Sequence, residues 1–167
     1  MAARQKRFSM TGELKKPNRD LMKSWLQEAR VEFSECGECE GLHLAALQGI
    51  EGVIDSRLFL ERYGLLLTTE LEIRPMALLA LSADLGRINM DYPTLKVFLD
   101  VVDDATPQLV MAGVQPTQPG LTLAQCAHFI SGTMDATRQL CAECLQLDYL
   151  FEEGGGNRGQ SPSRALH

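Results

Sequence analysis

The hydrophobic period of this sequence changes several times along the chain, and these changes constrain the fold more than any other feature. Apolar residues recur every three or four positions in some segments, as in amphipathic helices, and alternate with polar residues in others, as in strands with one buried face. In chain order we expect a helix over 17–32, strands over 42–46, 52–61 and 65–73, a helix over 76–88, strands over 94–102 and 109–114, and a helix over 122–147. The order α-β-β-β-α-β-β-α predicts an α+β domain, in which helices pack on an antiparallel sheet.

Two of the predicted helices suggest further contacts. The helix over 76–88 is apolar almost all round, so we expect it to be buried on both sides. The apolar residues of the last helix step by four and three over more than three heptads. Its second half is interpreted either as a contact with a second subunit or as packing within the domain. The apolar residues of this half are Leu140, Cys141, Cys144, Leu145 and Leu147.

The length and the charge distribution indicate one domain with two distinct ends. A chain of 167 residues is typical of a single domain, which we place at residues 17–151. Residues 1–16 carry five basic side chains and one acidic side chain, and form a basic arm. Residues 152–167 are rich in glycine and predict a disordered tail. The net charge is −6 although the arm is basic, so the domain is acidic and nucleic-acid binding by it is not expected.

Cysteine content and hydropathy indicate a cytoplasmic protein. The chain has five cysteines, an odd number that does not favour a closed disulfide framework and favours a reducing compartment. No apolar run approaches the roughly 18–20 residues of a membrane span, and the basic start lacks the apolar region of a signal peptide. We therefore expect no association with a membrane.

The most conspicuous chemical motif is Cys36-x-x-Cys39, followed by His43. Two thiolates at this spacing can hold one edge of a tetrahedral zinc site, with His43 as a candidate third ligand. A four-cysteine zinc site with Cys141 and Cys144 is an alternative. The simpler interpretation is that Cys141 and Cys144 are small apolar residues that only pack along one side of the helix.

Acidic residues around the first motif bear on redox chemistry. We expect Glu35, Glu38 and Glu40 to raise the pKa values of the neighbouring thiols and so to disfavour a redox catalyst. Other candidate sites are weaker. His128 is interpreted as an ordinary helix residue, and the Asp100, Asp103 and Asp104 cluster as a solvated turn.

Several motifs occur in the order in which the YbjN domain has them, and the chain resembles that family over about residues 20–135. The motifs are Glu35-Cys36-Gly37-Glu38-Cys39, Leu42-His43-Leu44, Gly52-Val53, Glu72-Ile73-Arg74-Pro75, Ala83-Asp84-Leu85, Ile88-Asn89 and Lys96-Val97-Phe98-Leu99-Asp100.

The resemblance implies a bacterial sensory-transduction regulator with a fold similar to that of type III secretion chaperones. Those chaperones are dimers that bind an effector segment over their sheet and helices. The first functional hypothesis is therefore a non-enzymatic adaptor that has no catalytic residues and binds a protein partner or effector segment. The resemblance to those chaperones also implies a homodimer. The alternative is a thiol-based zinc-binding or redox-sensing module centred on Cys36 and Cys39.

Overall fold

The chain folds into one mixed sheet-and-helix unit in a computed structural model that describes residues 12–101 and 106–151. The predictions for residues 1–11, for Asp103 and Asp104, and for residues 152–167 lie outside the described residues. The elements are α1 (Arg19–Glu28), β1 (Phe33–Glu35), β2 (Leu42–Leu44), α2 (Ala45–Gln48), β3 (Val53–Glu61), β4 (Gly64–Glu72), the 3₁₀ turn η1 (Pro75–Ala77), α3 (Leu78–Asp91), β5 (Lys96–Asp100), β6 (Gln108–Pro116) and α4 (Leu123–Gln146).

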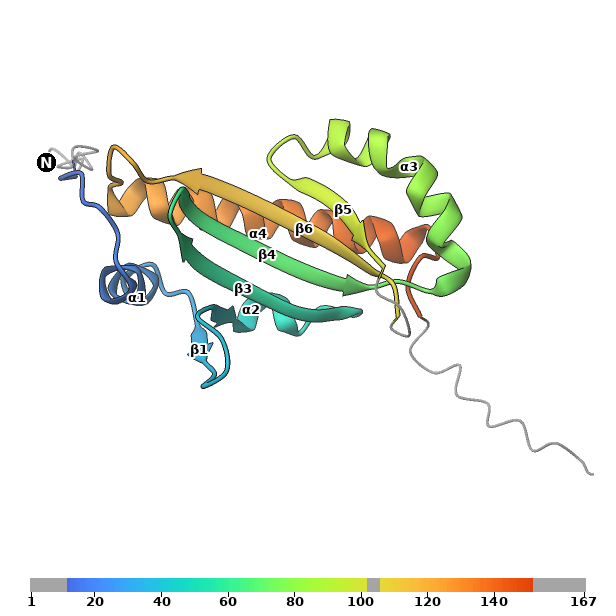
Figure 1. Cartoon of the computed structure of the whole chain (residues 1–167), viewed down its shortest axis with the longest axis horizontal. Helices are drawn as coiled ribbons and strands as arrows, with labels where there is room; N and C mark the ends of the chain where they lie inside the picture. The colour runs from blue at the N-terminus through green and yellow to red at the C-terminus, as the bar shows by residue number, and fades with distance from the viewer. Residues whose placement is uncertain (1–11, 102–105, 152–167) are drawn as a thin grey trace, which may run out of the picture.

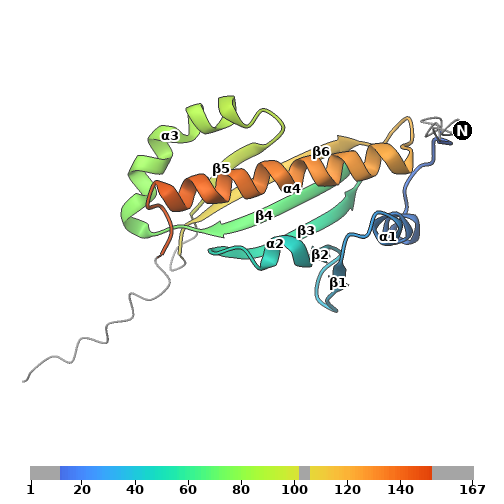
Figure 2. The same ribbon diagram turned by 180° about the vertical axis from the view of Figure 1, so that it is seen from behind.

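The six strands form one antiparallel sheet in the order β1-β2-β3-β4-β6-β5. α4 runs along one face of this sheet, with α1 near one end of it and α3 near the other (Figure 2). No helix in the described part of the chain lies over the opposite face (Figure 1), which we call the open face. The predicted α+β class is therefore confirmed, with the helices gathered on one side of the sheet.

Local sequence signals set the ends of the helices. α1 begins after Asn18, whose side chain accepts a hydrogen bond from the backbone of Leu21. α4 begins with a capping box in which Thr122 and Gln125 each bind the backbone of the other. Before α1, the backbone of Lys15 pairs with Leu121, so ordered structure starts within the segment predicted to be a basic arm.

Two apolar clusters lie between α4 and the sheet. The first joins α1, α2 and β2 to the beginning of α4, and includes Trp25, Leu44 and Ile130. The second joins η1, α3 and β5 to the end of α4, and includes Leu140, Cys141 and Cys144. The sheet and α3 of the same chain bury these last three residues, so for them packing within the domain holds. Leu145 and Leu147 are 46% and 44% exposed, and for them contact with a second subunit stays a prediction.

Two predicted elements differ from the structure. The alternation over 42–46 continues past the real strand, because Ala45 begins the short helix α2, and the edge strand β1 was not predicted. α3 is not buried on both sides: Leu81 and Ile88 are buried, whereas Leu79 and Met90 are 84% and 80% exposed. The helix therefore has an outer apolar side that nothing in the described chain covers.

Candidate metal centre

The cysteine motif lies in the loop of a short hairpin at one edge of the sheet. β1 and β2 pair antiparallel, and the loop between them carries Cys36 and Cys39. Leu42 and Leu44, the neighbours of His43 on β2, are fully buried under the helices. Because successive side chains of a strand point to opposite faces, His43 projects onto the open face.

A glycine allows the loop to return close to β3. A Cβ atom at Gly41 would lie 2.8 Å from a ring carbon of Phe59 and 3.1 Å from Cβ of Arg57. The first distance is too short for carbon atoms, so any larger residue would displace the loop or the ring of Phe59. Gly41 thus fixes the path that brings the two cysteines over His43.

The three side chains converge on one point. Sγ of Cys36 lies 3.1 Å from Nε2 of His43, and Sγ of Cys39 lies 3.4 Å from the same nitrogen. The two sulfur atoms are 3.1 Å apart. These atoms are the ligand types of a zinc site, and the structure brings the three candidate ligands Cys36, Cys39 and His43 together.

A carboxylate on β3 orients the imidazole. Oδ1 of Asp55 lies 2.9 Å from Nδ1 of His43, and the same oxygen accepts hydrogen bonds from Nε2 of Gln48 and from the backbone of Ser56. The register of β3 shifts between Val53 and Asp55, and such irregularities often redirect a side chain. Nδ1 of His43 therefore carries the proton that Asp55 accepts, and Nε2 faces the sulfur atoms.

Hydrogen bonds make Cys36 acidic. Contacts with Cys39, His43 and the backbone of Glu38 lower the pKa of the Cys36 thiol to about 6. The pKa of His43 is raised, first by its bond to Asp55 and then by the one to Cys36. Burial alone would raise the pKa of Asp55, but hydrogen bonds from His43 and Gln48 hold it below its ordinary value. The cluster therefore favours a thiolate at neutral pH.

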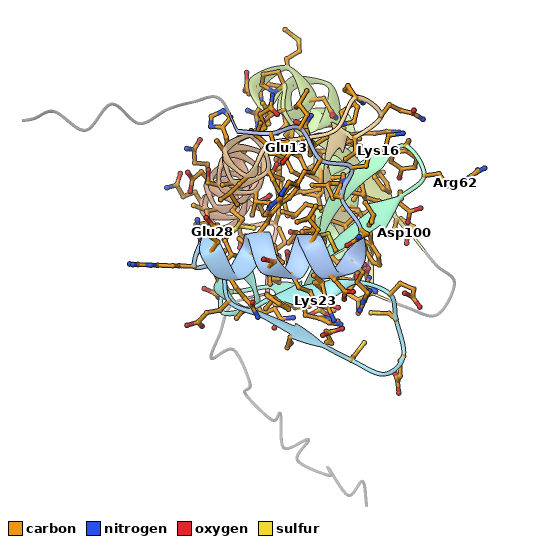
Figure 3. The ribbon with its side chains drawn as sticks, turned by 90° about the vertical axis from the view of Figure 1, so that its left-hand side faces the viewer. Glu13, Lys16, Lys23, Glu28, Arg62 and Asp100 are labelled. Atoms are coloured by element: carbon orange, nitrogen blue, oxygen red, sulfur yellow. The ribbon has the colours of Figure 1, made fainter. Side chains whose placement is uncertain are left out.

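The expectation that nearby glutamates raise the pKa of the Cys36 thiol is wrong. Glu35 forms ion pairs with Arg19 and Lys23 of α1, at 2.9 Å and 2.8 Å. Figure 3 shows Lys23 on the side of α1 that faces the hairpin. Glu40 is also within 3.6 Å of Arg19. Basic side chains of α1 thus offset the acidic charges that the linear sequence places beside the cysteines.

The other cysteines are separate from this cluster. Cys126, Cys141 and Cys144 are at most 2% exposed. Burial raises the pKa of Cys126 to about 11 and those of Cys141 and Cys144 to about 12. Within residues 12–101 and 106–151, the metal-ligand cluster contains only one of the two cysteine pairs. The four-cysteine zinc alternative is therefore wrong.

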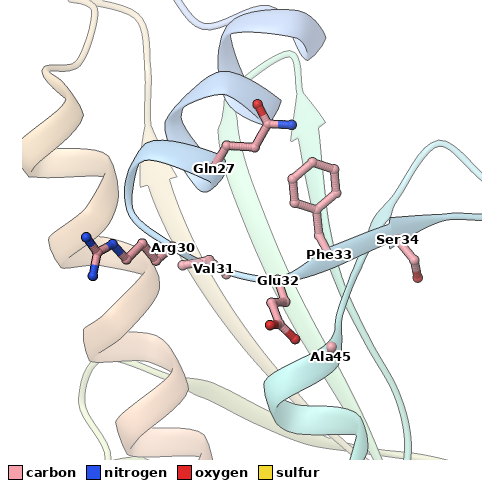
Figure 4. Close-up of a pocket in the computed structure, with 7 residues that line it drawn as sticks. All are labelled: Gln27, Arg30, Val31, Glu32, Phe33, Ser34 and Ala45. Atoms are coloured by element: carbon pink, nitrogen blue, oxygen red, sulfur yellow. The ribbon is translucent and has the colours of Figure 1, made fainter.

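A surface hollow lies between the end of α1 and the edge strand β1 (Figure 4). Its lining contains neither cysteine nor histidine, so it is distinct from the metal-ligand cluster. The lining residues are Gln27, Arg30, Val31, Glu32, Phe33, Ser34 and Ala45.

Comparison with known proteins places the chain in a family. Residues 18–146 match the family model described as "YbjN: Putative bacterial sensory transduction regulator". The chain belongs to the YbjN family. The resemblance drawn from the motif order is confirmed.

Relatives within the YbjN family share most of the chain. Proteins named "Uncharacterized protein YbjN" from Escherichia coli strain K12 and from Shigella flexneri are each 38% identical over 114 residues, which is 68% of this chain and 72% of theirs. The structure described as "Crystal structure of YbjN, a putative transcription regulator from E. coli" matches with a TM-score of 0.81 and 33% identity. The match covers 84% of this chain and 100% of that one, so the α+β fold is a YbjN fold.

Sequence reasoning missed the residues that support the cluster in this YbjN protein. Asp55 was assigned only to the polar side of a strand, and Gln48 only to a turn. The alternation of 52–61 does place Asp55 and Arg57 on the same side. Nothing in the linear pattern indicates that this side faces His43, because that depends on the pairing of β2 with β3.

Proposed function

We propose that this protein is a non-enzymatic regulatory or chaperone-like adaptor that acts by binding another protein through the open face of its sheet. The family is described as a regulator and not as an enzyme, which is consistent with this role. The observation that carries the proposal is the absence of a covering helix over this face in the described residues (Figure 1).

Strand register arranges the residues of the open face in rows that run across the sheet. Of four neighbouring rows, the first is apolar, the second joins basic and small residues, the third joins two acidic residues to two apolar ones, and the fourth is polar. In order across the sheet, these rows are Phe59, Leu66 and Val114; His43, Arg57, Thr68, Ala112 and Lys96; Asp55, Glu70, Val110 and Phe98; and Glu72, Gln108 and Asp100.

Apolar side chains of the open face remain accessible. Val114 is 49% exposed and Phe98 is 41% exposed. Arg57 and Glu70 form an ion pair between the apolar parts, so these two charges balance each other within the face. This pattern suits a partner segment that presents apolar side chains flanked by polar ones, because burial of the apolar area would supply most of the binding energy.

Affinity capture with surface variants tests this proposal. The tagged full-length chain is incubated with a bacterial cytoplasmic extract, beside Val114→Glu and Phe98→Glu. Leu147→Glu is the matched control, because Leu147 is 44% exposed at the end of α4, away from the sheet face. A protein retained by the wild type and the control but lost with both sheet variants supports the proposal. The proposal would be overturned if the wild type and all three variants retained the same proteins in equal amounts.

The proposal includes a homodimer, a cytoplasmic location, and no binding of nucleic acid or membranes. Exposed apolar residues on α3 favour self-association. The acidic net charge favours protein partners over nucleic acid. In the described residues, no helix combines the length and the apolar character that crossing a bilayer requires.

A second candidate function is a thiol-based zinc-binding or redox-sensing module, which the convergence of Cys36, Cys39 and His43 favours. In the redox form, the two cysteines would lose two electrons and two protons to an oxidant as a disulfide forms. The zinc form requires no second reactant apart from the ion.

A further inference from the structure

We propose that Cys36, Cys39 and His43 bind one Zn²⁺ ion, that a water molecule completes the site, and that Asp55 positions His43 for this role. The inference rests on the second candidate function. It is independent of partner binding by the open face, so each can fail without the other.

The ligand atoms already lie near the dimensions of a tetrahedral site. Zn–S bonds of about 2.3 Å and Zn–N bonds of about 2.05 Å place sulfur atoms roughly 3.8 Å apart and sulfur and nitrogen roughly 3.6 Å apart. The distances here are 3.1 Å between the sulfurs and 3.1 Å and 3.4 Å from the sulfurs to Nε2 of His43. An ion therefore requires the triangle to widen by less than about 1 Å, which side-chain rotation in the loop can supply.

The surroundings of His43 match those of a zinc-bound histidine. Such a histidine usually donates its second ring N–H to a carboxylate, which fixes the ring and the tautomer. Asp55 accepts from Nδ1 of His43, while Gln48 and the backbone of Ser56 hold the carboxylate in place. These contacts aim the lone pair of Nε2 at the point between the sulfurs.

The chemical types of the three ligand atoms favour one metal ion over others. Two thiolates and one imidazole are soft and borderline ligands, which favour zinc over magnesium or calcium. In the part of the chain that the structure describes, the cluster supplies three ligands, and Cys36 is exposed to solvent. The fourth position of a tetrahedral ion would therefore face water.

Binding involves proton release and no electron transfer. The ion forms two Zn–S bonds and one Zn–N bond, and any protons on the two thiols or on Nε2 pass to solvent. Bonds to Cys36 and Cys39 would tie the loop to His43 on β2. The hairpin at this edge of the sheet would then be held by the metal.

Metal titration of the full chain, stripped of metal with a chelator that is then removed, tests the inference. Co²⁺ is added first, because cobalt–thiolate bonds absorb in the near ultraviolet and tetrahedral cobalt absorbs in the visible. Zn²⁺ is then added to displace it. We expect saturation at one ion per chain, an intensity that corresponds to two thiolates, and loss of both bands on addition of Zn²⁺.

Ligand variants locate the site. Cys36→Ser and Cys39→Ser are each expected to weaken Zn²⁺ binding by at least 100-fold and to remove half of the thiolate band. His128→Gln is the matched control, because this histidine is exposed on α4 and should have no effect. Circular dichroism checks that each variant is folded. Binding that is absent in the wild type, or unchanged in the folded Cys36→Ser/Cys39→Ser double variant, would overturn the inference.

The Asp55→Asn variant tests whether Asp55 positions His43 without binding the ion itself. Loss of a carboxylate partner typically weakens metal binding by about 10–100-fold. We expect this loss of affinity together with an unchanged thiolate band at saturating Co²⁺, because Asp55 is not itself a ligand. An unchanged affinity, or loss of the thiolate band, would contradict the role assigned to Asp55.

Discussion

Local hydrogen bonds and burial divide four of the five cysteines into two chemical groups. Cys36 is exposed and has three hydrogen-bond partners that lower its pKa to about 6. Burial raises the pKa of Cys126 to about 11 and those of Cys141 and Cys144 to about 12. Because the thiolate is the reactive form, only the first group should be reactive in the folded protein.

In the metal-free protein, iodoacetamide is therefore expected to alkylate Cys36 with a rate that rises with pH and reaches half its maximum near pH 6. The thiolate fraction increases as the pH passes the pKa, which sets the sign of the effect. Mass spectrometry of the labelled peptides measures the rate at each position.

Two substitutions of Cys39 test why the pKa of Cys36 is low, because the contact with Cys39 is the largest cause of that low pKa. Cys39→Ala should move the midpoint of Cys36 upward, toward the ordinary value of 9.0. Cys39→Ser keeps a hydrogen-bond donor, so the midpoint of Cys36 in this variant should lie lower than in Cys39→Ala. A wild-type midpoint near 9 would contradict the hydrogen-bonded arrangement.

The sequence predicted the members of the cluster but not their electrostatics. The spacing of Cys36, Cys39 and His43 is local and is visible without a structure. The direction of the Cys36 pKa shift is not, because it depends on hydrogen bonds from Cys39, His43 and the backbone of Glu38 that form only when the loop folds over β2. The linear sequence shows the acidic charges beside the cysteines but not these hydrogen bonds.

Close packing between α4 and β6 depends on one glycine. A Cβ at Gly113 would lie 2.7 Å from Cγ2 of Thr133 and 2.8 Å from its Oγ1. Gly113→Ala is therefore expected to lower the free energy of unfolding by about 1–3 kcal/mol, because the buried helix and strand must separate. Urea denaturation measures the change.

Gly132 serves as a control for which the opposite change in stability is expected. It is exposed within α4, and a Cβ there would have no atom within 4 Å. Gly132→Ala should raise the free energy of unfolding by about 1 kcal/mol, because alanine restricts the unfolded chain and favours the helix. If both variants moved stability in the same direction, the packing argument for Gly113 would be refuted.

A hydrogen bond between the end of α3 and α4 should make stability depend on pH. The hydroxyl of Tyr92 donates to Oε2 of Glu143 at 2.7 Å. This bond is the main reason why the pKa of Glu143 lies below its ordinary value of 4.5. The stabilisation is thus present above about pH 4.5 and is lost as the pH falls through the lower pKa of the folded state.

Tyr92→Phe is expected to cost about 1 kcal/mol at pH 7 and progressively less in acid. Chemical denaturation at a series of pH values measures the difference. Tyr63→Phe is the control, because Tyr63 is 52% exposed in a turn and should show little change at any pH. A deficit for Tyr92→Phe that stays constant down to pH 3 would exclude the proposed link to Glu143.

The long, periodic elements were predictable from the sequence, whereas the short elements β1 and α2 were not. The two longest helices and the β3–β4 pair have enough residues for their period to be read. β1 has three residues and α2 has four, so neither completes a recognisable pattern. Their positions depend instead on pairing with β2 and on the burial of Leu47 in the first apolar cluster.

The outer side of α3 suggests how two whole molecules would associate. Leu79 and Met90 are 84% and 80% exposed, with the small residues Ala83 and Gly86 between them, and Met76 in the preceding turn η1 is 90% exposed. The four positions in α3 step by four, three and four, so they lie along one side of the helix. A symmetric pair of α3 helices could bury both stripes, and the small residues would allow close approach.

Light scattering at micromolar concentration is expected to give twice the chain mass of 18.5 kDa. Leu79→Lys should return the mass to that of a monomer, because it places a charge in the centre of the contact. Leu145→Lys, at a position that is 46% exposed on α4, should remain dimeric. A wild-type mass of 18.5 kDa would exclude the dimer.

The division of the interior into two apolar clusters along α4 has a consequence for hydrogen exchange. Opening of the β1–β2 hairpin and α1 would expose the first cluster while leaving the second intact. Amide protons of β1 and β2 should therefore exchange through smaller openings than those of β4 and β6, which are central strands. The metal-ligand loop thus lies in the part of the molecule that can open without global unfolding, where a bound ion would slow exchange most.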